Sequence, residues 1–94
     1  MTVYVPNAFT PNGDGVNEVF IPVLDGYDAT DYEFMIFDRW GEQLWTSDTP
    51  NEGWDGTYKD GTIVPDGVYV WKLKAKDIGT KEESIYKGHV TILR

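Results

Sequence analysis

The sequence predicts an all-β protein, an antiparallel β-sandwich of about seven strands, from three observations. Residues 69–76 alternate between apolar side chains and a row that is mostly lysine, which is the period of a strand with one face in a core and one in water. Asp-Gly turn signals at 55–56, 60–61 and 66–67 separate short runs rich in β-branched and aromatic residues. No segment shows the 3.6-residue period of an amphipathic helix.

The individual elements follow from local patterns along the chain. Residues 3–5 form an apolar run ended by Pro6, which suits an edge strand. Residues 7–18 are dense in Asn, Gly, Pro and Asp and are expected to be a loop. Strands are expected at 19–23, 32–38, 43–46, 69–76 and 83–93, with 32–38 central because its middle is apolar on both faces. Polar turns are expected at 25–31, 39–42 and 77–81.

Length and composition exclude several classes of function. The 94 residues make one domain, 1–94, and no apolar run approaches the roughly 20 residues of a membrane-spanning helix. Residues 1–58 carry eleven acids and one base, net −10, whereas residues 59–94 carry five acids and seven bases, net +2, for a total of −8. Because such a chain repels phosphate, we expect no nucleic-acid binding. The chain has no cysteine, so it offers no disulfide and no thiolate.

No catalytic constellation is expected. His89, the single histidine, lies in an alternating strand and is predicted to point outward from the sheet. The two serines, Ser47 and Ser84, lack a nucleophile elbow, and the glycine-rich segment 12–15 lacks the lysine and following helix of a phosphate loop. We therefore predict that the domain is not an enzyme.

One loop has the spacing of a calcium site. On the template of a calcium-binding loop, the ligand positions 1, 3, 5, 7 and 9 fall on Thr10, Asn12, Asp14, Val16 (through its carbonyl) and Glu18. Two departures weaken the match, since Thr10 replaces the first aspartate and Ile21 replaces the bidentate glutamate at position 12. The same letters also suit Asx-capped turns without an ion. No cofactor is required by the sequence, and Ca²⁺ is the one that the pattern allows.

The four tryptophans leave two interpretations open. Trp71 belongs to the apolar face of the 69–76 strand and is expected in the core. Trp40, Trp45 and Trp54 flank turns, where large rings either cover the ends of a sandwich or stack on carbohydrate. Packing is favoured, because the sequence places no polar cluster beside these rings.

Five blocks, in order and spacing, resemble one family over essentially the whole chain. They are residues 6–20 (PNAFTPNGDGVNEVF), 37–41 (FDRWG), 53–57 (GWDGT), 64–69 (VPDGVY) and 88–92 (GHVTI). The family is the gliding-motility-associated C-terminal domain, the type B sorting domain of the type IX secretion system in Bacteroidetes. Glu18 stands where the family usually has aspartate. The second half alone is also similar to the Ig-like domain of flagellar hook-capping proteins, which supports an Ig-like sandwich.

The resemblance implies a sorting domain at the C-terminus of a larger exported protein, whose upstream cargo domains are absent from this fragment. It implies export through the periplasm to the cell surface or medium. The implied partners are the type IX translocon and a PorP/SprF-like outer-membrane protein. The rival interpretation is a calcium-dependent adhesion or glycan-binding Ig-like module. We expect a partner to recognise the loop 7–20 and the end of the last strand, 86–94, because the most family-specific residues there have no evident role in the core. The predicted recognition residues are Asn7, Phe9, Asn12, Asp14, Asn17, Gly88, Val90, Ile92 and Arg94.

Overall fold

A computed structural model of the chain describes residues 1–11, 13 and 18–94. Over these residues it is all-β, and it contains no helix that could cross a membrane. Seven strands form two open sheets, consistent with the predicted sandwich. They are β1 (Thr2–Tyr4), β2 (Ala8–Phe9), β3 (Val23–Asp25), β4 (Tyr27–Phe37), β5 (Gln43–Ser47), β6 (Gly67–Asp77) and β7 (Glu83–Ile92).

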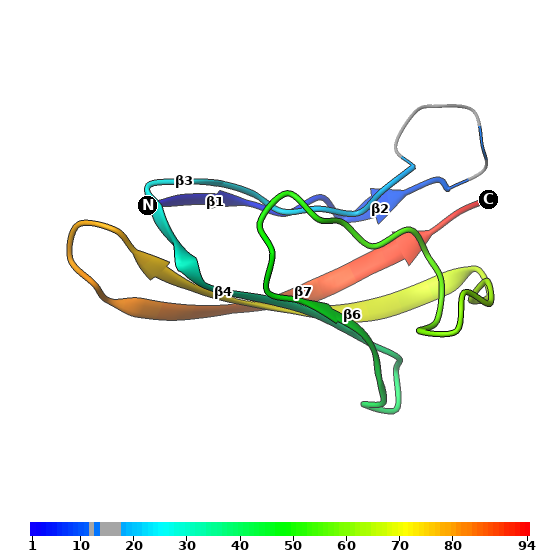
Figure 1. Ribbon diagram of the computed structural model, residues 1–94. Helices are drawn as coiled ribbons and strands as arrows, with labels where there is room; N and C mark the ends of the chain where they lie inside the picture. The colour runs from blue at the N-terminus through cyan, green and yellow to red at the C-terminus, as the bar shows by residue number, and fades with distance from the viewer. Residues whose placement is uncertain (12, 14–17) are drawn as a thin grey trace.

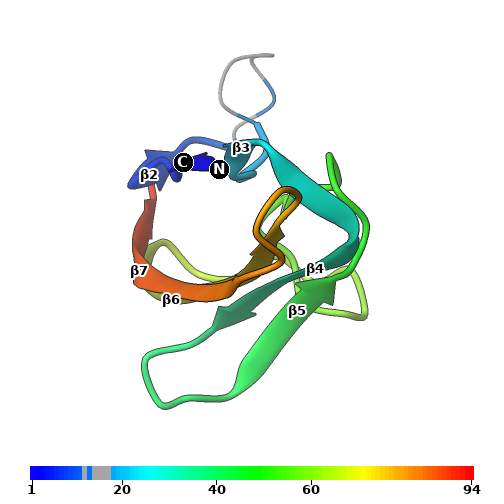
Figure 2. The same ribbon diagram turned by 90° about the vertical axis from the view of Figure 1, so that its left-hand side faces the viewer.

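The larger sheet has the order β2-β7-β6-β4-β5, and β1 pairs with β3 in a separate two-stranded sheet. Figure 1 shows β1, β2 and β3 running above the long strands. Seen end-on in Figure 2, the five-stranded sheet curls from β2 round to β5, with its concave side toward β1 and β3. Strand β6 is the middle strand of this sheet, which explains why its pattern is the clearest in the sequence.

The core lies on the concave side of the large sheet. Along β6 the expected alternation is confirmed: Tyr69, Trp71, Leu73 and Ala75 are buried and the residues between them are half-buried. Strand β4 contributes Phe34 and Ile36, both 0% exposed, and it is central as predicted, with β5 on one side and β6 on the other. The core cluster is completed by Phe9, Phe20, Tyr32, Leu44, Trp54, Val64, Val90 and Ile92. Burial raises the pKa of Tyr32 to about 12.

Two predicted hairpins are confirmed. Between β4 and β5, Asp38 N–H donates to the Glu42 carbonyl at 2.9 Å, and Gly41 takes the left-handed conformation that glycine adopts without steric cost (φ +88°). Between β6 and β7, the Asp77 carboxylate accepts hydrogen bonds from the N–H groups of Gly79 and Thr80. These bonds, together with the N-terminal ammonium group, lower the pKa of Asp77 to about 2.

Two predictions between residues 19 and 31 were wrong. The expected strand at 19–23 is replaced by a single bridge between Phe20 and Trp54, and β3 begins only at Val23, after Pro22, which has no N–H to donate to a ladder. The expected turn at 25–31 is mostly strand, because β4 already begins at Tyr27. The polar residues of this segment lie where the β4–β6 register is irregular, between Tyr27 and Tyr32.

One pairing departs from the predicted antiparallel arrangement. Strand β2, inside the segment expected to be loop, runs parallel to the end of β7, with Ala8 opposite Thr91 and Phe9 opposite Ile92. The other strand pairs are antiparallel. This parallel pair brings the first sequence block to the last strand.

Candidate functional site

The two segments that were predicted to be recognised lie side by side. Thr91 N–H donates to the Asn7 carbonyl at 2.9 Å, and Leu93 N–H donates to the Phe9 carbonyl at 3.2 Å. Figure 1 shows β2 next to the C-terminal end of β7, at the end of the molecule opposite the turn between β6 and β7. We call this region, with Asn7, Ala8 and Leu93 as exposed members, the chain-end surface.

Several predicted recognition residues serve the fold instead. The side chains of Phe9, Val90 and Ile92 are 2%, 0% and 0% exposed, so they cannot touch a partner of the folded domain. Gly88 faces Trp71. A Cβ atom at this position would lie 2.6 Å from the indole ring, a clash that only glycine avoids. The prediction that the side chains of Phe9, Val90 and Ile92 contact a partner directly is corrected on this ground, whereas Gly88 is half-buried and its role in recognition stays a prediction. Recognition of the surrounding chain-end surface stays a prediction.

Arg94 ties the end of the chain to two turns. Its guanidinium donates from Nη1 to the Val64 carbonyl at 2.6 Å and from Nη2 to the Gly56 carbonyl at 3.0 Å. Nη1 also lies 3.1 Å from the Asp66 carboxylate, which in addition accepts the backbone N–H of Arg94 at 3.0 Å. A Cβ atom on Gly56 would lie 2.6 Å from Nη2, so this glycine makes room for the arginine. Arg94 is thus a structural clamp at the edge of the chain-end surface.

An aromatic cluster lies beneath this surface. The Trp54 ring lies 5.7 Å from the Phe9 ring and 5.4 Å from the Tyr69 ring, and its Nε1–H donates to the Thr57 carbonyl at 2.8 Å. Phe20 stacks on Phe9 with ring centroids 5.6 Å apart and exchanges two backbone hydrogen bonds with Trp54. The first, third and fourth sequence blocks therefore meet in one packed unit, which explains why their large rings are spaced as they are.

The predicted calcium ligands fall mainly outside the described residues. Asn12, Asp14, Val16 and also Asn17, which was predicted for recognition, belong to that part of the chain. Of the two remaining ligands, Glu18 accepts the Gly13 N–H with both carboxylate oxygens, at 3.1 and 2.9 Å. Thr10 also has a polar or electrostatic interaction within the fold. Over residues 1–11, 13 and 18–94, no group of three His, Asp or Glu side chains is placed to hold a metal ion. The calcium site stays a prediction.

A thermal melt tests the calcium site. If the ion is bound by the native state alone, calcium at one hundred times its dissociation constant raises the free energy of unfolding by about 2.7 kcal/mol. The melting temperature in millimolar calcium should then exceed that in chelator by several degrees. Magnesium at equal concentration is the control for ionic strength. Coincident melts in calcium and chelator would refute the calcium site.

Trp40 is the most exposed of the four tryptophans. Trp54 and Trp71 are buried, in line with the packing interpretation, and Trp45 packs edge-on against Phe34. Trp40 is 78% exposed on the β4–β5 turn, and the Arg39 guanidinium lies 4.3 Å from its ring centroid. The neighbouring hollow, about 250 Å³, is lined by Asp38, Arg39, Trp40, Tyr58, Pro65, Asp66, Gly67, Val68 and Tyr69.

The histidine and the serines of the described chain are not brought together. His89 is exposed on β7, opposite Val70, as predicted. Ser47 lies on β5, three strands away across the sheet, which corresponds to about 14 Å. Ser84 precedes His89 by five residues on the same strand, about 17 Å along it. Neither hydroxyl is in reach of the imidazole, so this fold builds no serine–histidine pair.

Comparisons with known proteins identify the family of this chain. The family model described as CHU_C, type IX secretion signal domain, matches residues 3–92, and this is a secretion signal family, not an enzyme family. No curated protein matches the chain. Among solved structures, PorZ of Porphyromonas gingivalis, described as an essential surface component of the type IX secretion system, superimposes with a TM-score of 0.50 at 24% identity. The match covers 99% of this chain and 11% of PorZ, and at this identity it supports the fold alone. The chain belongs to the type IX secretion signal domain family.

Proposed function

We propose that this domain is a folded export signal, read by the outer-membrane machinery of type IX secretion at the chain-end surface. Membership of the family makes it a secretion signal that directs an attached protein to the cell surface or medium. The observation that supports reading in the folded state is the length of the match, residues 3–92, which spans every strand except the first residue of β1. The five sequence blocks become neighbours only after folding, so a linear peptide would not present them together.

The exposed groups of the chain-end surface suit a protein partner. Strand β2 is an edge of the large sheet, so its outer side can receive a strand from a partner. Leu93, 55% exposed, follows directly after β7 and lies beside this edge. Asn7 and Ala8 are also exposed. A PorP/SprF-like outer-membrane protein, met after folding in the periplasm, is the partner we propose.

The family match favours export over the rival role as a calcium-dependent adhesion or glycan-binding module. The exposed Trp40 keeps the glycan role testable on the isolated domain. Binding of immobilised glycans that is lost in Trp40→Ala, with export unaffected, would show a separate activity in addition to sorting.

Leu93→Ser tests the proposed surface. The full domain is fused to a fluorescent protein that carries a Sec signal, and the fluorescence outside the cells of a bacterium with a type IX system is measured. We expect the wild-type fusion to be exported and Leu93→Ser to reduce export at least fivefold. The reason is that removing an exposed apolar contact at an interface costs about 1–2 kcal/mol of binding.

Ile78→Ser is the matched control for this variant. Ile78 is 57% exposed, close to the 55% of Leu93, but it lies on the β6–β7 turn at the opposite end of the molecule (Figure 1). Because both changes are on the surface, both melting temperatures should stay near that of the wild type. Equal export of Leu93→Ser and Ile78→Ser would refute the chain-end surface. A wild-type fusion that stays inside the cells would refute the export role itself.

A further inference from the structure

The convex face of the five-stranded sheet is a second surface, which the chain-end surface does not include. The register places Val70, Lys72, Lys74 and Lys76 of β6 opposite His89, Lys87, Ile85 and Glu83 of β7. On the other side of β6, Glu33, Met35 and Phe37 of β4 lie opposite Lys74, Lys72 and Val70. All of these residues alternate with the core residues and so point away from the core. We call them the convex face.

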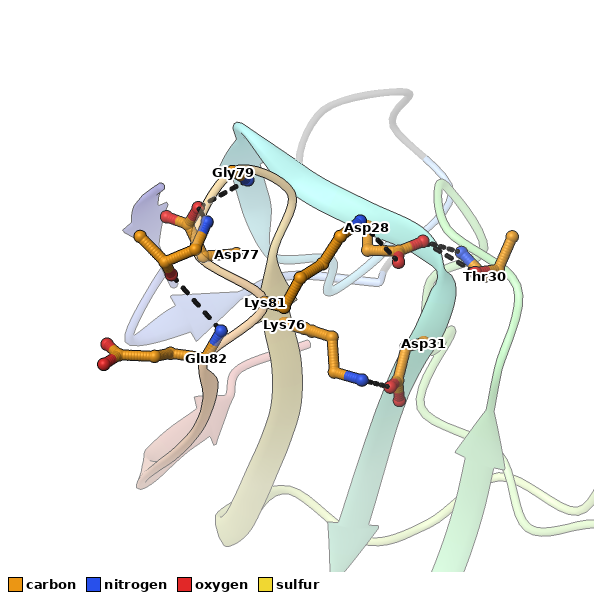
Figure 3. A network of polar contacts seen from close by, with 9 residues as sticks. Asp28, Thr30, Asp31, Lys76, Asp77, Gly79, Lys81 and Glu82 are labelled. Carbon is orange, nitrogen blue, oxygen red and sulfur yellow. Dashed lines mark hydrogen bonds and ion pairs between the residues drawn. The ribbon is translucent and has the colours of Figure 1, made fainter.

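Two lysines at its centre face each other. Lys72 and Lys87 are direct cross-strand partners. Their neighbours are ion-paired: the Lys74 ammonium lies 3.6 Å from the Glu83 carboxylate. The Lys76 ammonium lies 2.9 Å from the Asp31 carboxylate, as Figure 3 shows. Among the described residues, by contrast, no carboxylate lies within 4.0 Å of the ammonium group of Lys72 or Lys87.

This arrangement is unfavourable for the isolated domain. Like charges directly opposite each other on neighbouring strands repel, whereas a glutamate at either position would attract the remaining lysine. The chain has sixteen acidic and eight basic residues, so an acidic residue opposite a lysine would be more common in this sequence than a second lysine. The lysine pair therefore favours a partner that supplies a negative charge.

Apolar groups surround the lysine pair. Met35 lies beside Lys72 and is 9% exposed. Ile85 is 53% exposed, and Val70 is half-buried one step along the face. An occupant of this face would thus meet a positive centre with apolar contacts on either side, a combination that favours a segment with both carboxylates and apolar side chains.

We propose that the convex face docks an acidic, partly apolar segment of a partner protein. A carboxylate of this segment binds between the ammonium groups of Lys72 and Lys87, and its apolar side chains cover Ile85 and Val70. A membrane or polyanionic glycan fits less well. Both are extended negative surfaces that the −8 net charge of the chain repels, and two lysines without carboxylate partners offset little of that repulsion. A short segment touches only the convex face and therefore avoids most of the repulsion from the acidic residues elsewhere on the domain.

The first test measures stability and does not depend on export. Lys87→Glu replaces the repulsive pair by an attractive one, so its melting temperature should rise by about 1–3 °C. Lys59→Glu is the matched control, because it makes the same change of charge in an exposed turn and has no cross-strand lysine partner in β4, β6 or β7. It should melt at or slightly below the wild-type temperature. If Lys87→Glu melts lower than Lys59→Glu, the lysines do not repel and the proposal is wrong.

The second test measures binding with defined probes. A ten-residue peptide of alternating glutamate and valine is added to the isotope-labelled full domain at low salt, and amide NMR shifts are recorded. We expect shifts at Val70, Lys72, Ile85 and Lys87, an affinity at least tenfold weaker for Lys87→Glu, and wild-type affinity for Lys59→Glu. Phosphatidylglycerol vesicles and poly-glutamate should leave these amides unmoved or bind more weakly than the peptide. No shift with the peptide, or stronger binding to vesicles or poly-glutamate, would overturn the proposal, whatever the export assay gives.

Discussion

Trp54→Ala is expected to lower the free energy of unfolding by about 3–5 kcal/mol, the range found when a large buried aromatic side chain is truncated. Trp54 is 0% exposed and joins the Phe9 ring to the Tyr69 ring. The change also removes the Nε1–H bond to the Thr57 carbonyl. Because small domains are stable by about 5–15 kcal/mol, this loss is a large fraction of the total. Urea unfolding followed by circular dichroism measures it.

Trp40→Ala is the control for this variant, because it removes the same side chain from a position that is 78% exposed. Its effect should stay within about 0.5 kcal/mol, as for most surface substitutions. A second variant, Trp54→Phe, keeps most of the ring packing and loses the Nε1–H bond, so it should lie between the two. If Trp54→Ala and Trp40→Ala were equally stable, the aromatic cluster would not hold the end of the sandwich together.

The long strands could be predicted because burial on one face leaves a period of two in the sequence. In β6 that period runs through Tyr69, Trp71 and Leu73, all buried as expected. The turn between β4 and β5 was also readable, since Asp38 and Gly41 have the local chemistry that a tight turn requires. These features depend on neighbours in the sequence and need no knowledge of the rest of the chain.

The shorter elements could not be predicted in the same way. A two-residue strand such as β2 has no measurable period, and its pairing with β7 joins residues more than eighty positions apart. In the segment after Gly26, the Thr30 N–H and hydroxyl both donate hydrogen bonds to the Asp28 carboxylate, an arrangement typical of a turn. In the structure these bonds occur inside β4, where the register to β6 is irregular. Polar letters with local hydrogen bonds do not distinguish a turn from an irregular strand.

The candidate site shows a related limit. The alternation in the last strand places Val90 and Ile92 on one face, but it does not say whether that face meets the core or a partner. The structure answers this, since both side chains are 0% exposed. Family-specific residues such as Val90 and Ile92 were therefore predicted to contact a partner, whereas their side chains pack in the core. The exposed Leu93 lay within the predicted last strand but was not among the named recognition residues, because no periodic neighbour follows it in the sequence.

Deleting residues 88–94 is expected to unfold the domain, not merely to remove a recognition signal. The deletion takes away Val90 and Ile92, which are 0% exposed, and each such side chain stabilises the fold by about 1.5–3 kcal/mol. It also removes the hydrogen bonds that hold β2, half of the β6–β7 ladder and the Arg94 clamp on Val64 and Gly56. Together these losses approach the whole stability of a domain of this size. The truncated chain should show no cooperative melt.

A truncation that stops export therefore does not by itself identify the last strand as the recognised signal, because an unfolded chain would lose every surface at once. Removing Arg94 alone separates the two effects: it deletes the clamp but leaves β7, and should cost about 1–3 kcal/mol. That variant should still melt cooperatively and keep most of its export, whereas Leu93→Ser should keep the fold and lose export. If the 88–94 deletion melted like the wild type and failed only in export, the strand would act as a linear signal. The proposal that the folded surface is read would then be wrong.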